Sequence, residues 1–431
     1  MSQVVPPRPP AWFRLFPFLK APEDLTPLQW RLLGLLGLTV LINHYDFGLL
    51  GAALLQIQRD LGISERGIGN VAGAVRAGSV LALGLAVVAD RRGRRRLLLL
   101  TIVGFTVCTA LTAFARTAAQ FTALQFLARA FVTAEEMLAV VVIAEELGAL
   151  RRGFGLGVLG ALGSLGNGLA FVAFGFIDAI PYGWRALYLV GVLPLLWLAW
   201  IRRSLPETRR FEDERSRRHS EAAPLAALRP VLDLLGVYPL RALALVLAVA
   251  PASMVMVSGA TFAVKFLQEA HGWPPGAIPL LMAGGGALVF ASMALAGAWA
   301  DRLGRRRLAM AAVVLNAAGL TLFYNGSGWW VVPGWILMTA GFVSADVIFG
   351  ALGSELFPTS YRATASGLRT FAWTGGGALG LFVESNLVFP LVESHATALT
   401  WMLAGAWIAP AVLLALPETA RRELEEISPA T

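Results

Sequence analysis

The feature that most constrains this chain is a charged motif that occurs twice, 211 residues apart, each time between two long apolar segments. Residues 297–307 read Gly-Ala-Trp-Ala-Asp-Arg-Leu-Gly-Arg-Arg-Arg, and residues 86–96 read Ala-Val-Val-Ala-Asp-Arg-Arg-Gly-Arg-Arg-Arg. A Pro-Glu-Thr triplet repeats at the same spacing, at residues 206–208 and 417–419. Signals that recur at one long spacing indicate an internal duplication, so we predict two related halves of about 200 residues each.

The composition places these halves in a lipid bilayer. Hydrophobic residues make up 57% of the 431 residues and charged residues only 14%, whereas soluble domains carry about 25% charged residues. A membrane-spanning helix needs about 20 apolar residues. On this basis we expect helices over residues 31–57, 67–89, 96–115, 120–145, 153–177, 184–202, 240–268, 276–300, 307–325, 331–356, 363–390 and 396–416.

The predicted fold class is therefore an all-α membrane protein with about 12 transmembrane helices in two pseudo-symmetric bundles of six. The expected organisation is a tail over residues 1–30, a first bundle over 31–202, a charged connector over 203–237, a second bundle over 238–416 and a tail over 417–431.

The net charge of +8 follows membrane topology and does not indicate nucleic-acid binding. Twenty-five Arg and Lys residues fall in the tails, the connector and the turns on one side, and four fall in the opposite turns. Cytoplasmic loops carry such an excess. We therefore expect a multi-pass protein of the plasma membrane (the inner membrane in a bacterium), with both termini cytoplasmic, no nucleic-acid partner and a single working chain.

No motif predicts a cofactor, a metal site or an enzyme. The sequence Gly155-x-Gly157-x-x-Gly160 lies within an apolar helical segment and not after a strand, as a dinucleotide site requires. Glycines at such spacing let membrane helices approach closely. The single cysteine, Cys108, excludes a disulfide framework, and the four histidines lie in different segments.

Six charged residues fall inside the predicted spans, where they must face a cavity or form a pair. They are Asp46, Arg76, Arg129, Glu135, Glu136 and Asp346. A carboxyl group in an apolar cavity favours its neutral form, and a nearby arginine favours its charged form. Asp46, at a depth comparable to that of Arg129, is therefore a candidate to bind and release a proton. A permanent structural ion pair is the alternative.

Arg76 is either a counter-ion for the buried acids or an anchor for an anionic substrate. The other candidates for the lining of a substrate cavity are Asn43, His44, Glu135, Glu136, Asn167, Asp346 and Trp373. Asn386 is a weaker candidate. Lys265 and Glu384 lie nearer the ends of their helices, so we expect them at a gate or rim.

These motifs resemble those of a known family. The two Asp-x-x-Gly-Arg-Arg loops are similar to the loop signature of the major facilitator superfamily, with Ala86 in place of a glycine in the first copy. Tyr45-Asp46-x-Gly48-x-x-Gly51, Arg129 and Glu355-Leu-Phe-Pro-x-x-x-Arg362 resemble its sugar-porter and metabolite:proton-symporter branch. The resemblance implies a carrier that works by alternating access, with its substrate site near the midplane between the halves.

The resemblance also implies roles for individual residues. Asp46 would be the proton-coupling carboxylate and Arg129 its partner. A cytoplasmic lattice of salt bridges, with Glu145 paired to Arg152 and Glu355 to Arg362, would hold that side shut in one state and break in the other. Its expected members are Asp90, Gly93, Arg94, Glu145, Arg152, Glu207, Asp301, Gly304, Arg305, Glu355, Arg362 and Glu418.

Departures from the sugar-porter pattern argue against a sugar. Residues 250–261 lack the Gln-Gln and Asn that sugar porters use to bind hydroxyl groups, and Glu135 and Glu136 stand where those proteins keep glycines. We therefore predict secondary active transport of a small organic anion or metabolite, coupled to protons. Proton-driven efflux of amphipathic or cationic compounds, a sugar-type facilitator and, more remotely, a non-transporting membrane sensor are the alternatives.

Overall fold

The computed structural model describes residues 10–15, 22, 25–82, 84–85, 94–147, 151–202 and 229–419. Within these ranges every regular element is a helix. Nine of the described helices are long and apolar enough to span a membrane, and Leu97–Thr112 is a shorter apolar helix.

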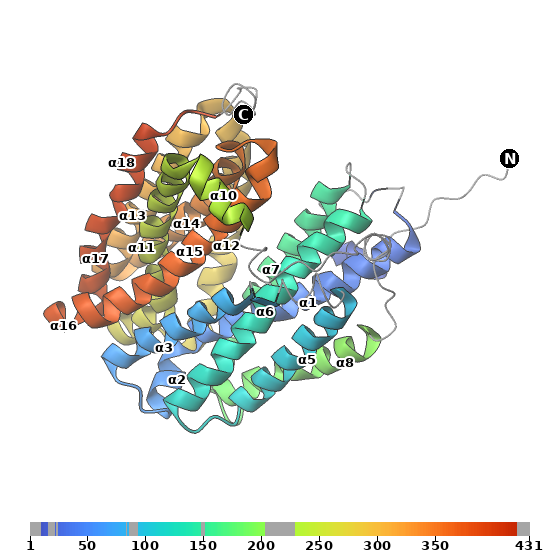
Figure 1. The fold of residues 1–431 in the computed structure, drawn as a ribbon. Coiled ribbons are helices and arrows are strands. Elements are labelled where there is room, and N and C mark those ends of the chain that lie inside the picture. Colours follow the sequence, from blue (N-terminus) through green and yellow to red (C-terminus); the bar gives the residue numbers. More distant parts are fainter. Residues whose placement is uncertain are drawn as a thin grey trace.

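The first half supplies one group of helices, drawn from blue to green at the lower right of Figure 1. Its elements are η1 (Ala11–Leu15), α1 (Pro27–Ala52), α2 (Leu54–Asp60), α3 (Glu65–Ala77), η2 (Gly78–Val80), α5 (Arg94–Thr112), α6 (Ala118–Glu146), α7 (Arg152–Phe174) and α8 (Trp184–Arg202).

The second half supplies the other group, drawn from yellow-green to red at the upper left of Figure 1. Its elements are α10 (Arg229–Val237), α11 (Pro239–His271), η4 (Pro275–Ala277), α12 (Ile278–Leu303), α13 (Arg305–Asn325), η5 (Gly328–Trp330), α14 (Val331–Glu355), η6 (Thr359–Tyr361), α15 (Arg362–Val383), η7 (Glu384–Val388), α16 (Phe389–Val392), α17 (His395–Ala406) and α18 (Ile408–Ala415).

Each predicted span overlaps a helix, but 31–57, 363–390 and 396–416 are each divided into shorter helices, and the end of 67–89 falls partly outside the described residues. Local chemistry explains where some of the helices begin and turn. Thr26 and Gln29 form a capping box that starts α1 at Pro27, four residues earlier than predicted. Gly304 adopts a positive φ of 99° between α12 and α13, a conformation that favours glycine. Most of the connector, residues 203–228, and most of the two predicted tails lie outside the described residues.

Small residues allow the helices to pack closely. A Cβ atom added at Gly334 on α14 would lie 2.6 Å from the backbone nitrogen of Phe323 on α13. One added at Gly341 would lie 2.7 Å from the carbonyl oxygen of Ala312. Because lipid is as apolar as the side chains, close van der Waals packing of this kind holds membrane helices together.

The two ends of the molecule differ in how the halves meet. We call the end at which α1 and α11 begin the terminal end, and the end at which they finish the far end. One hydrophobic core cluster joins the halves towards the far end, with Ile68 and Phe174 from the first half and Phe262 and Leu399 from the second. Towards the terminal end each half has separate core clusters of its own. The halves are therefore fastened together at the far end.

Candidate functional site

A cavity of about 280 Å³ lies between the two halves. The first half lines it with the polar side chains Arg76, Arg129 and Asn167. The second half lines it mostly with apolar, thioether and aromatic side chains, namely Met256, Val257, Met282, Trp335, Met338 and Phe342. Two threonines, Thr261 and Thr339, lie among them. The first half also contributes apolar side chains such as Phe47, Val75 and Phe171, so the two arginines lie on one side of a cavity whose lining is otherwise largely apolar.

Arg76 projects from α3 towards the second half. A Cβ atom added at Gly377 of α15 would lie 2.7 Å from the Nε atom of Arg76. The same Cβ atom would also contact the side chain of Val257 on α11. This buried Nε has no hydrogen-bond partner among the described residues. A buried donor without an acceptor destabilises the protein, and more so when it carries charge.

Arg129 borders two cavities at once. Its guanidinium lies over the ring of Phe47, 3.9 Å from the ring centroid, in a cation–π arrangement. It lines the central cavity and also a much smaller pocket that contains Asp46, Asn43 and Gln125. The two cavities share Phe47, Leu50, Val75 and Arg129, of which Arg129 is the charged one.

Asp46 is buried, with 7% of its surface exposed. Its Oδ1 accepts a hydrogen bond of 3.2 Å from the hydroxyl group of Thr109 on α5. Among the described residues, the ion pairs do not include Asp46 with Arg129. The expected partnership is thus not a direct salt bridge in this conformation, because the Phe47 ring holds the arginine and Thr109 holds the carboxylate.

The small pocket beside Asp46 is polar. Asn43 is 1% exposed, and neither atom of its side-chain amide has a partner among the described residues. Gln125 donates a hydrogen bond of 3.2 Å to the hydroxyl of Thr112. Thr109 and Gln125 were not predicted from the sequence, because neutral polar residues are common in α5 and α6 and do not stand out as a buried charge does.

The other acids on α6 point in different directions. Glu136 lies 3.4 Å from Nε2 of His44 on α1, and both side chains are partly exposed. Glu135 is 1% exposed. Adjacent helical residues point about 100° apart, which agrees with these separate surroundings.

Of the predicted lining residues, Arg76 and Asn167 line the central cavity, whereas Asn43, His44, Glu135, Glu136, Asp346, Trp373 and Asn386 do not. Asp346 on α14 pairs with Arg369 on α15 at 2.7 Å. Trp373 packs its ring edge-on against Phe342, with 5.5 Å between centroids. Asn386 bonds to Asn70 at the far end.

Polar groups at the terminal end of the second half form a compact cluster. Arg305 pairs with Glu355, whose Oε2 also accepts a 2.8 Å hydrogen bond from Thr419. The Glu418 carboxylate accepts a 2.7 Å hydrogen bond from the backbone N–H of Arg305, at the start of α13. Gly304 leaves room for this carboxylate. Glu355 thus pairs with Arg305, and the Nε of Arg362 has no partner among the described residues.

The rest of the predicted lattice is only partly described. Glu145 lies one residue before the end of α6, and Arg152 begins α7. Arg94 begins α5 and Asp301 lies in α12, but their side chains are outside the described portion. Asp90, Gly93 and Glu207 fall outside the described residues.

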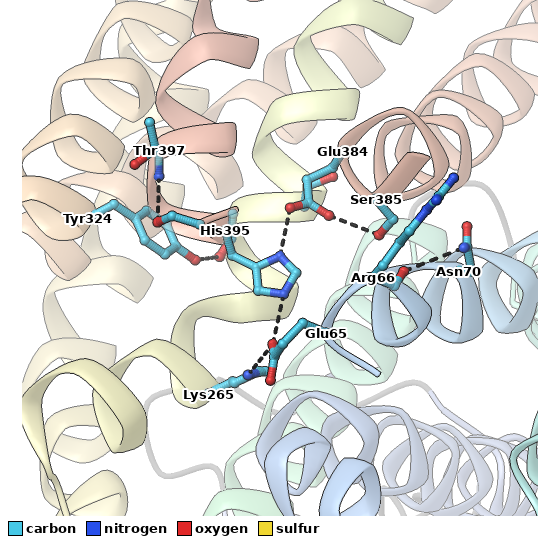
Figure 2. A network of polar contacts seen from close by, with 12 residues as sticks. Glu65, Arg66, Asn70, Lys265, Tyr324, Glu384, Ser385, His395 and Thr397 are labelled. Atoms are coloured by element: carbon cyan, nitrogen blue, oxygen red, sulfur yellow. Dashed lines mark hydrogen bonds and ion pairs between the residues drawn. The ribbon is translucent and has the colours of Figure 1, made fainter. Parts of the chain in front are cut away.

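A second charged cluster joins the halves at the far end (Figure 2). Nζ of Lys265 lies 2.9 Å from Oε2 of Glu65 and also pairs with Glu269. Nε2 of His395 lies 3.2 Å from the same Glu65 oxygen, and its Nδ1 lies 2.7 Å from Oε1 of Glu384. We call Glu65, Lys265, Glu269, Glu384 and His395 the far-end cluster.

Lys265 and Glu384 were predicted at a gate or at the rim of the substrate cavity, whereas Glu65 and His395 were not predicted to have a role. Both of these residues begin helices, where polar residues are ordinary, so no signal distinguished them. Two neutral contacts accompany the cluster: Gln56 with Gln268 at 2.7 Å, and the Asn70–Asn386 amide pair.

Comparison with known proteins identifies the family. The sequence profile of the Major Facilitator Superfamily matches residues 36–381, which is most of the chain. The chain belongs to the major facilitator superfamily. Among solved structures, the xylose transporter XylE from E. coli in an inward open conformation superposes with a TM-score of 0.72 at 18% identity, over 93% of this chain and 99% of that one. The predicted all-α fold class is confirmed, and the chain is a transport protein and not an enzyme.

Two curated relatives are similar in sequence to this transporter. A gallate transporter of Pseudomonas putida is 32% identical over 48% of this chain and 46% of that protein, so the match spans less than half of its length. A protein named probable 4-methylmuconolactone transporter, from Cupriavidus pinatubonensis, is 27% identical over 80% of both chains.

Proposed function

We propose that this transporter carries a small organic carboxylate with a ring or another apolar body, in symport with protons. The observation that carries the proposal is the pair of arginines, Arg76 and Arg129, on one side of a central cavity whose lining is otherwise largely apolar. A carboxylate in the cavity would lie beside both guanidinium groups. Arginine suits this role because its planar guanidinium matches the geometry of a carboxylate.

The apolar lining favours a compact, ring-shaped body. Met256, Met338, Trp335 and Phe342 offer thioether and aromatic surface but few hydrogen-bonding groups. A volume of about 280 Å³ lies just below the usual range for ligand pockets, about 300–1,000 Å³. Gallate, which the relative in Pseudomonas putida is named for, shares the single ring and the one carboxylate, but its three hydroxyl groups would need partners such as Thr261 and Thr339.

Arg129 explains how a proton and an anion would bind together. The Asp46 carboxylate and a substrate carboxylate would both interact with Arg129, which lines both pockets. Protonation of Asp46 removes the competing negative charge, so the arginine becomes available to the substrate. The coupling is reciprocal, because a bound anion in turn favours a protonated Asp46.

The proposal includes an orientation. The excess of Arg and Lys in the predicted tails, connector and turns on one side supports a cytoplasmic location for the terminal end, in the plasma membrane. We further propose that a single chain is the working unit. The far end, which the far-end cluster holds closed, then faces outwards. Glu145, Arg152, Glu355, Arg362 and the remaining lattice residues would hold the terminal end shut in the opposite, outward-facing state.

Ligand-dependent thermal stabilisation of the purified transporter tests this function. The panel consists of benzoate and other ring carboxylates, their uncharged amides, sugars, amines and lipophilic cations. A ligand at 100 times its Kd adds about 2.7 kcal/mol of stability. We expect stabilisation by carboxylates and not by the matching amides.

The matched variants are Arg76→Gln in the cavity and Arg369→Gln outside it. A hydrogen bond to a charged group contributes about 1.5–3 kcal/mol, and 1.4 kcal/mol is tenfold in affinity. Arg76→Gln should therefore weaken carboxylate binding about tenfold to a hundredfold, while Arg369→Gln leaves it nearly unchanged. Stabilisation confined to amines or lipophilic cations, and lost with Glu136→Gln, would instead establish efflux of cations.

A further inference from the structure

The far-end cluster holds one imidazole between two carboxylates that belong to different halves (Figure 2). Nδ1 of His395 lies 2.7 Å from Oε1 of Glu384, and Nε2 lies 3.2 Å from Oε2 of Glu65. The ring stacks on Phe262 with 4.3 Å between centroids. Glu384 is fully buried and accepts a second hydrogen bond from Ser385. The ring therefore cannot turn away from either acid without losing its packing.

Both ring nitrogens of His395 face carboxylate oxygens. A neutral imidazole has one donor and one acceptor, so it can donate to one of these acids only. Its lone pair would then point at the oxygen of the other acid. Hydrogen bonds from the ring to or from both acids require either a protonated imidazole or a protonated carboxyl group on Glu65 or Glu384. In each case the closed cluster contains one more proton than a neutral imidazole with two carboxylates.

We propose that Glu65, Glu384 and His395 form a proton-binding site that is assembled when the far end of the transporter closes. When the far end opens, Glu65 leaves with the first half. His395 then keeps only Glu384, which a neutral imidazole satisfies with one N–H. Closure takes up a proton and opening releases it. This site is separate from Asp46 and needs no substrate; only its placement on the outer side rests on the proposed function.

The surrounding charges support the extra proton. Without it, the five members of the cluster carry three negative charges and one positive charge, from Lys265. Lys265 is 2% exposed and already pairs with both Glu65 and Glu269. A proton brings this partly buried cluster closer to neutrality. The charged and titratable groups around the ring are Glu65 and Arg66 on α3, Lys265 and Glu269 on α11, Tyr324 on α13 and Glu384 on η7.

The sign of the effect suits a transporter that imports its substrate with protons. Acid outside the cell favours closure of the outer gate once the substrate has entered. A more alkaline medium favours opening. For one proton, the ratio of closed to open molecules changes by up to about tenfold per pH unit.

The test is a distance measurement across the far end at different pH values, without substrate. Spin labels are attached at Arg116→Cys in the first half and Thr397→Cys in the second, two exposed positions. The background carries Cys108→Ala and Asp46→Asn, so that the proton site of the proposed function is absent. We expect the closed fraction to rise as the pH falls. A closed-to-open ratio that does not change with pH would overturn the proposal.

Three variants assign the proton to this cluster. Glu65→Gln is nearly isosteric at a half-exposed position, and its amide can donate to a neutral ring, so the pH dependence should disappear. His395→Gln should abolish it too. Lys265→Met leaves the ring between both acids; it should favour the open state and keep the pH dependence. If Glu65→Gln and His395→Gln both retain the original pH dependence, the proposal is wrong. Failure of proton coupling through Asp46 in transport assays would leave these results unchanged.

Discussion

At the scale of single residues, the proposed transport cycle depends on whether Asp46 exchanges a proton. Asp46→Asn removes the charge but keeps a side chain that can bond to Thr109. We expect accumulation driven by a pH gradient to be lost. Exchange of internal for external substrate should continue, because exchange needs no net proton movement. Uptake of a labelled carboxylate into proteoliposomes, with and without a gradient, measures both.

Thr109→Val is the matched control for Asp46→Asn. It removes the hydroxyl that bonds to Asp46 but leaves the carboxyl group in place, so gradient-driven accumulation should persist. Full accumulation by Asp46→Asn would show that the coupling proton binds elsewhere.

The contrast between Arg76 and Asp346 shows how far residue-level prediction from the sequence could go. Both were recognised because a charge inside an apolar helix is unusual. Arg76 lines the cavity, whereas Asp346 pairs with Arg369 on a neighbouring helix. The helix of Asp346, α14, is apolar on nearly every side, so its sequence does not indicate the direction in which this side chain points. Pairs between distant elements, such as Glu65 and His395, leave no sequence pattern at all.

At the scale of elements, two glycines with close neighbours should respond differently to alanine. At Gly334 the added Cβ meets the backbone of Phe323 on α13 at 2.6 Å, which cannot move without separating two helices. At Gly377 it meets the side chains of Arg76 and Val257. Gly334→Ala should therefore lower the free energy of unfolding by about 1–3 kcal/mol. Gly377→Ala should mainly weaken substrate binding by displacing Arg76.

Thermal unfolding and carboxylate binding by each variant in detergent test this contrast. Equal losses of stability would show that Gly377 only serves helix packing. The helices themselves were largely predictable, since each predicted apolar run overlaps a helix in the part of the chain that the structure describes. The breaks were not: η7 interrupts the end of α15, and Trp407 separates α17 from α18, although the apolar pattern continues through both places.

At the scale of the whole molecule, the halves must separate at the far end in each transport cycle. Asn70 and Asn386 come from different halves and bond through both amides, at 2.5 and 3.2 Å. A cross-link between Asn70→Cys and Asn386→Cys, in a Cys108→Ala background, should therefore stop uptake while it is intact. Reduction should restore uptake. Binding of the carboxylate in the closed state should survive the cross-link.

A cross-link within one half is the matched control. Asn325 and Thr400 are bonded at 3.0 Å near the far end, but both belong to the second half. Linking Asn325→Cys to Thr400→Cys should leave uptake intact, because neither bundle needs to change internally when rigid halves rock about a central site. Uptake that continues through an intact Asn70–Asn386 link would contradict alternating access at this end. Loss of uptake with both links would mean that the second half itself changes shape during transport.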